Sequence, residues 1–102
     1  MKLINEILCS ILQFDTIEEA IHRANTSHYG LAAGVCSTNI ATAIGIAKRL
    51  KAGTVWINMY DDFDAALPFG GYKESGWGRE KGEYALENFT EVKMIQFPVN
   101  NY

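Results

Sequence analysis

The chain has 102 residues, 48% of them hydrophobic and 21% charged, and a formal net charge of −3. This length allows one domain or part of one, and the composition excludes disordered, fibrous and disulfide-dense classes. The basic residues are scattered along an acidic chain, so we expect no nucleic-acid partner. No window approaches the ~20 apolar residues of a membrane-spanning helix. We therefore expect no membrane partner and a cytoplasmic location, with the mitochondrion as the alternative.

The chain opens with a pattern typical of a strand followed by a helix. Residues 7–14 (ILCSILQF) are a continuous, mostly apolar run, which predicts a strand buried on both faces. Asp15 is a suitable N-cap with Glu18 three residues later, and apolar residues at helical spacing then predict a helix to about Asn25. Residues 29–30 (YG) break this pattern.

The middle of the chain repeats the alternation. Residues 31–36 (LAAGVC) predict a second strand, and residues 54–58 (TVWIN) a third. Between them, Thr38 or Asn39 can cap a helix that stops before Gly53. The expected apolar stripe of that helix consists of Ile40, Ala43, Ile44, Ala47 and Leu50. The order strand, helix, strand, helix, strand predicts parallel crossovers.

The last part of the chain is less regular. Residues 59–78 show no periodicity, and we interpret so long a loop as functional. A short helix is expected at residues 79–89 and a terminal strand at residues 91–97. The predicted fold class is therefore α/β: a small parallel β-α-β-α-β unit followed by a long loop, a short helix and a terminal strand.

Three segments carry a resemblance to a known family. Residues 52–58 (AGTVWIN), 67–76 (LPFGGYKESG) and 78–80 (GRE) closely resemble the aldehyde dehydrogenase superfamily, and the match extends over residues 11–97. The resemblance implies the carboxy-terminal part of an enzyme that oxidises aldehydes to carboxylic acids with NAD(P).

The resemblance also implies a domain organisation. Residues 7–90 would be part of the catalytic domain, residues 91–97 the oligomerisation strand, and residues 98–102 a polar tail. The implied partner is a second copy of this chain or a full-length aldehyde dehydrogenase.

The family residues that perform the chemistry have no counterpart here. In the family, the nucleophilic cysteine, the general-base glutamate, the oxyanion-hole asparagine and the dinucleotide domain all precede the matched region. Glu6 stands near a family glutamate that holds the nicotinamide ribose, but the Gly-Pro that follows it is missing, so we assign Glu6 no cofactor role. We expect no catalytic residue, no metal and no cofactor bound by the isolated chain, with NAD(P) implied for the full-length family.

Three residues are expected at the substrate. By resemblance, Asp61, Phe63 and Phe69 line the aldehyde tunnel, where aromatic rings can hold the apolar part of an aldehyde. Their role would be binding.

The remaining reactive side chains favour structural roles. Cys9 and Cys36 lie in apolar runs, which predicts buried, reduced thiols rather than a nucleophile or a disulfide. His22 and His28 lack ligand spacing, so exposed or capping roles are expected. The acidic residues at 61–64 lack the pattern of a calcium loop and indicate a solvated loop.

Two hypotheses of different classes follow. In the first, the chain is part of an aldehyde dehydrogenase and has no catalytic activity alone. In the second, it is an interaction module whose edge strand at residues 91–97 pairs with itself or with a full-length relative.

Overall fold

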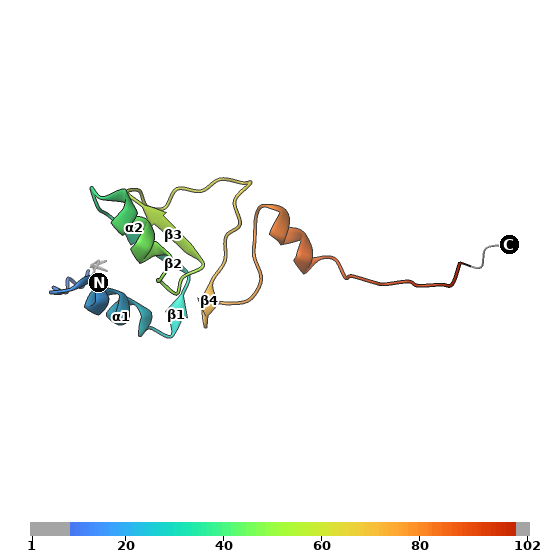
Figure 1. Cartoon of the computed structure of the whole chain (residues 1–102), viewed down its shortest axis with the longest axis horizontal. Helices are drawn as coiled ribbons and strands as arrows, with labels where there is room; N and C mark the ends of the chain where they lie inside the picture. Colours follow the sequence, from blue (N-terminus) through green and yellow to red (C-terminus); the bar gives the residue numbers. More distant parts are fainter. Residues whose placement is uncertain (1–8, 100–102) are drawn as a thin grey trace, which may run out of the picture.

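The computed structural model describes residues 9–99 and confirms the predicted mixed α/β class (Figure 1). Among these residues, no helix is long and apolar enough to cross a membrane. The elements in chain order are α1 (Ile17–Asn25), β1 (Tyr29–Gly30), β2 (Ala32–Val35), α2 (Ile40–Ala47), β3 (Thr54–Ile57), β4 (Tyr72–Lys73) and the 3-10 helix η1 (Glu83–Asn88).

The centre of the fold is the parallel pair β2–β3, which α2 connects. The register runs from Ala32 opposite Thr54 to Val35 opposite Ile57. The parallel strand–helix–strand unit is therefore confirmed for residues 32–57. Four apolar side chains of the described residues are buried in this region: Ile21, Val35, Ala43 and Trp56.

Helix α1 begins one residue later than the sequence indicated. Thr16, not Asp15, is the N-cap, and its hydroxyl accepts a 3.2 Å hydrogen bond from the Glu19 amide. The Glu19 carboxylate reaches back to the Asp15 amide at 2.9 Å. The two bonds satisfy amides that the first turn leaves without helical partners, so Glu19 has the reciprocal role expected of Glu18.

Glu18 instead connects the two helices. Its carboxylate accepts two hydrogen bonds from the guanidinium of Arg49, which lies just after α2. Nearby, the Asn25 side chain donates to the Arg49 carbonyl at 2.9 Å and accepts from the Lys51 amide at 2.7 Å. The end of α1 is thus fixed to the connection between α2 and β3.

Asn39 is the N-cap of α2, one of the two residues expected there, and accepts from the Thr42 amide at 3.1 Å. The predicted apolar stripe is only partly correct, because Ala43 is fully buried whereas Ile40 and Ile44 are exposed. The helix also ends at Ala47, before the expected stop near Gly53. The last residue of the stripe, Leu50, therefore follows the helix.

The strand predicted at residues 7–14 is wrong in its described part, and residues 7–8 lie outside the described residues. Residues 9–14 form no strand, and Ile11 and Leu12 are exposed. A run that is apolar on both faces needs cover on both faces. The described residues do not supply that cover, so the apolar pattern is not sufficient to form the strand.

A second, antiparallel pair was not expected. β1 pairs with β4, with Tyr29 opposite Lys73 and Gly30 opposite Tyr72. The predicted break at residues 29–30 is therefore a short strand. Gly30 suits this place because a Cβ there would overlap the Lys51 carbonyl oxygen. The long loop at residues 59–78 consequently contains a strand that returns to the end of α1.

The helix predicted at residues 79–89 is shorter and of another type. Lys81 and Gly82 have φ angles of 61° and 58°, which an α-helix does not accommodate. The Glu80 amide and carbonyl are also engaged in an antiparallel bridge with Phe69, at 2.7 Å each. Only η1, from Glu83 to Asn88, remains helical.

The strand predicted at residues 91–97 is not formed. These residues are exposed and extend away from the rest of the chain after η1 (Figure 1). A strand exists through hydrogen bonds to a neighbouring strand, and within residues 9–99 this segment has no such neighbour.

The carboxylates of α1 predict an acid-sensitive fold. The hydrogen bond from Arg49 holds the pKa of Glu18 below its ordinary value of 4.5. The bond from the Asp15 amide, followed by the charge of Arg23, does the same for Glu19. A folded-state pKa below the unfolded value means that the stabilisation is complete above about pH 5 and is lost as the pH falls through the folded value.

We expect the urea midpoint of unfolding to fall between about pH 5 and pH 3, and Glu18→Gln to make this dependence shallower. Glu87→Gln is the matched control, because Glu87 makes no ion pair within the described residues. Equal pH dependence in the Glu18 and Glu87 variants would contradict the assignment. The measurement is urea unfolding followed by fluorescence across this pH range.

Candidate functional site

The structure brings two of the three predicted substrate residues together. The rings of Phe63 and Phe69 lie edge to face with centroids 5.1 Å apart. Trp56 of β3 continues the cluster, with its ring 5.5 Å from Phe63 and 5.0 Å from Tyr60. Edge-to-face contacts at these distances are among the favoured geometries for aromatic pairs. A strand residue and three loop residues thus form one aromatic cluster.

A cavity of about 270 Å³ lies beside this cluster. Its lining includes Trp56, Phe63, Leu67, Pro68 and Phe69. Apolar side chains share the lining with Thr54, Asp62 and Asp64, and the cavity has β3 on one side and the loop on the other. Its size and chemistry suit a small apolar or aromatic group.

Asp61 has a different position. It is exposed, has a φ angle of 60°, and is absent from the lining of this cavity. Asp62 and Asp64, which the sequence grouped with it, are the acidic residues that border the cavity. Within residues 9–99, no group of three or more histidine, cysteine or acidic side chains could hold a metal ion.

The loop that carries Phe69 is fixed by its backbone. Gly53 begins the approach to β3, and a Cβ there would overlap the carbonyl oxygen of Gly70. On the other side, the Arg79 guanidinium donates to the carbonyls of Gly71 at 3.1 Å and Gly78 at 2.6 Å. The backbone that directly follows Phe69 is therefore fixed, and the Phe69 amide and carbonyl are themselves bonded to Glu80.

Two contacts of the cluster were missed from the sequence. The Trp56 indole donates from Nε1 to the Asp62 carbonyl at 2.8 Å, which closes the loop over the strand. The Lys81 ammonium lies 4.4 Å from the centroid of the Phe63 ring, a cation–π contact. The preference of a buried indole for a hydrogen-bond acceptor could have indicated the first. Nothing in the local pattern indicates the second.

The prediction of buried cysteines is wrong. Cys9 and Cys36 are both exposed. Apolar sequence neighbours do not bury a thiol when the segment itself is uncovered, as at residues 9–14, or when the residue lies just beyond its strand, as Cys36 does after β2. His22 and His28 are exposed, and His28 Nδ1 lies 4.0 Å from a Glu74 carboxylate oxygen.

The arrangement can bind an apolar group but offers little for bond making. The side chains around the cavity are aromatic, aliphatic or acidic, apart from the hydroxyl-bearing Thr54, and the two cysteines are not among them. A nucleophile paired with a base is the usual sign of covalent catalysis. The described residues around this cavity present a binding surface instead.

Comparison with known proteins finds a family match over most of the chain. The family model described as the aldehyde dehydrogenase family matches residues 8–95. A mitochondrial benzaldehyde dehydrogenase of Antirrhinum majus is 56% identical over 92 residues, which are 90% of this chain and 17% of that protein. A mitochondrial aldehyde dehydrogenase of Rattus norvegicus is 56% identical over 89 residues, 87% of this chain and 17% of that protein.

Solved structures match the same family. An aldehyde dehydrogenase of Bacillus cereus, determined as an NAD⁺ complex, superposes with a TM-score of 0.78 at 65% identity. The superposition covers 80% of this chain and 17% of that one. The chain therefore spans about one sixth of the length of the relatives that it matches.

The two tryptophans predict contrasting variants. Trp56 is buried and hydrogen-bonded, whereas Trp77 is fully exposed. Trp56→Phe removes the bond to Asp62 and part of the packing, so we expect a loss of about 1–2 kcal/mol in unfolding free energy. Trp77→Phe should change it by less than about 0.5 kcal/mol. Urea unfolding followed by circular dichroism measures both, and equal losses would contradict the burial of Trp56.

Proposed function

The chain belongs to the aldehyde dehydrogenase family, and on that premise we propose that it supplies the apolar wall of the aldehyde pocket in an enzyme that oxidises aldehydes to carboxylic acids with NAD(P). The observation that carries the proposal is the aromatic pair Phe63 and Phe69 beside a cavity. The pair lies next to residues 70–78, which we call the glycine-rich loop. An aromatic wall binds an apolar aldehyde by removing its surface from water.

The proposal assigns binding, and no bond-making step, to these residues. Phe63 and Phe69 orient the apolar body of the aldehyde. Asp61 would contact the aldehyde where the remainder of the enzyme completes the tunnel near it. The nucleophile, the general base and the dinucleotide site belong to parts of the family that this chain does not match. We therefore propose that the isolated chain is catalytically inactive.

The described residues do not fit a dinucleotide. A pyrophosphate normally binds where a glycine-rich turn opens an α-helix. Here residues 70–78 lead into the Phe69–Glu80 bridge and then into the 3-10 helix η1. NAD(P) is accordingly proposed for the longer enzyme, and no step is assigned to it through these residues.

A chimaera tests the proposal. The segment of the Bacillus cereus enzyme that corresponds to residues 11–97 is replaced by this chain, whose identity to that enzyme is 65% over the superposed part. We expect the purified chimaera to oxidise benzaldehyde with NAD⁺, and the isolated chain to show no such oxidation. A folded, NAD⁺-binding chimaera without oxidation, or oxidation by the isolated chain, would overturn the proposal.

Within the chimaera, Phe69→Ala should raise the KM for benzaldehyde about three- to tenfold, because one aromatic contact contributes about 0.5–1.5 kcal/mol. The kcat should change less, since the ring binds the ground state and the transition state alike. Phe89→Ala is the matched control, because Phe89 is exposed and lies outside the cluster. An unchanged KM in the Phe69 variant would contradict the assignment of this ring to the aldehyde pocket.

We propose, as a second function, association through residues 91–97. The observation that favours it is an extended segment whose apolar side chains are all exposed: Val92, Met94, Ile95 and Phe97. Unpaired extended backbone with apolar side chains is a template for pairing with another strand. The partner would be a second copy or a full-length aldehyde dehydrogenase.

Sedimentation velocity of the chain tests this association. We expect a dimer or larger species at high concentration, and Ile95→Pro should disperse it by removing a backbone donor within the segment. Val99→Pro is the control, because Val99 is equally apolar and exposed but lies beyond residue 97. A strict monomer of the unsubstituted chain, or equal dispersal by both prolines, would argue against association through residues 91–97.

A further inference from the structure

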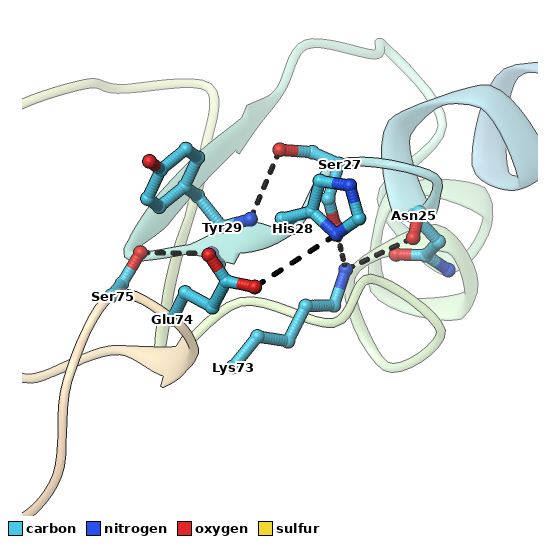
Figure 2. Close-up of polar contacts among 8 residues, drawn as sticks. Asn25, Ser27, His28, Tyr29, Lys73, Glu74 and Ser75 are labelled. Carbon is cyan, nitrogen blue, oxygen red and sulfur yellow. Dashed lines mark hydrogen bonds and ion pairs between the residues drawn. The ribbon is translucent and has the colours of Figure 1, made fainter.

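Two segments far apart in sequence lie side by side (Figure 2). The first runs from the end of α1 through β1, and the second consists of β4 and the turn after it. Besides the β1–β4 pairing, the Glu74 amide donates to the His28 carbonyl at 3.1 Å. The Gly30 amide donates to the Ser75 hydroxyl at 2.9 Å. We name this set of contacts the clasp.

Lys73 is the central residue of the clasp. Its ammonium donates to the Asn25 carbonyl at 2.9 Å and to the Ser27 carbonyl at 2.8 Å (Figure 2). The carbonyls at the end of a helix have no helical partners and carry partial negative charge, so a cation is favoured there. The Lys73 side chain thus supplies a hydrogen-bond donor to carbonyls at the end of α1 and holds β4 against that end.

The backbone of Lys73 adds a second observation. Its φ angle is 55°, in the left-handed region that lysine rarely adopts. A strained conformation persists where surrounding contacts fix it, and such residues are frequent at functional sites. The two ammonium hydrogen bonds and the pairing with Tyr29 are the contacts that fix it here.

The clasp is directly connected in sequence to Phe69 of the aromatic cluster. Only Gly70 and Gly71 separate Phe69 from β4, and Gly71 is buried. The backbone at Gly70 rests on Gly53, so little room remains for movement of the backbone between the clasp and Phe69. A shift of β4 would therefore be transmitted to Phe69.

We propose that Lys73 is a positioning residue for the aldehyde pocket: by binding the carbonyl end of α1 through its ammonium, it sets the place of the glycine-rich loop and of Phe69. The inference rests on the proposed function of that wall. Lys73 touches no substrate, and it acts through the backbone between β4 and Phe69.

Amide hydrogen exchange of the chain, measured by NMR, tests the clasp without any catalysis. Lys73→Asn removes the ammonium but keeps a residue that tolerates a positive φ. We expect the Gly30 and Glu74 amides to exchange about tenfold faster, while the Asn58 amide, bonded to Val35 in the central sheet, is unaffected. Lys48→Met is the matched control, because the Lys48 ammonium makes no hydrogen bond within the described residues.

The chimaera measures the consequence for binding. Lys73→Asn should raise the KM for benzaldehyde about threefold or more and leave kcat within about twofold, as expected when an interaction common to ground and transition states is lost. Lys73→Arg, which keeps a cationic donor for the two carbonyls, should restore KM.

The outcomes separate this inference from the proposed function. A chimaera that is inactive with Lys73 intact overturns the proposed function, while the exchange measurement still decides whether the clasp exists. Unchanged exchange at Gly30 and Glu74 overturns the inference. So does equal acceleration at Asn58, which would show that Lys73 supports the whole fold, and so does a KM change that Lys73→Arg does not reverse.

Discussion

The arrangement of the molecule depends on one close contact between backbones. The glycine-rich loop lies directly on the start of β3, where Gly53 leaves room for the Gly70 carbonyl and any side chain would displace it. Because the loop is in contact there, Phe69 comes within reach of Phe63, and Phe63 within reach of Trp56. The aromatic cluster and its cavity are consequences of this contact between glycines.

Around this contact the chain buries little. Only four apolar side chains of the described residues are buried, whereas many large ones are exposed. An open apolar cavity of about 330 Å³ also lies between α1, β2 and α2, with Ile17, Ile21 and Val35 in its lining. Exposed apolar surface of this extent is typical of regions that contact other protein surfaces. It agrees with a chain that matches one sixth of its relatives' length.

The structure also shows how a loop without periodicity can be ordered. Residues 59–78 contain few apolar repeats, yet their backbone and side chains have specific partners in α1, β1 and β3. The Trp56 indole bonds to the loop carbonyl of Asp62, and the Lys73 ammonium bonds to the end of α1. These polar contacts to backbone carbonyls order the loop together with the packing of Phe63 against Trp56 and Phe69.

The sequence by itself determined the family, the α/β class and the elements whose signals are local. The periodicity of α1, the Asn39 cap and the β-branched run at residues 54–57 depend only on near neighbours, so they could be read directly. Tertiary structure decided what needs a distant partner: the β1–β4 pairing, the burial of Ala43 but not Ile40, and the uncovered residues 9–14 and 91–97. It also left Asp61 out of the lining of the cavity that Phe63 and Phe69 border. The physical reason is that a strand, a buried face and a cavity are relations between segments, and the pattern of one segment does not specify what covers it.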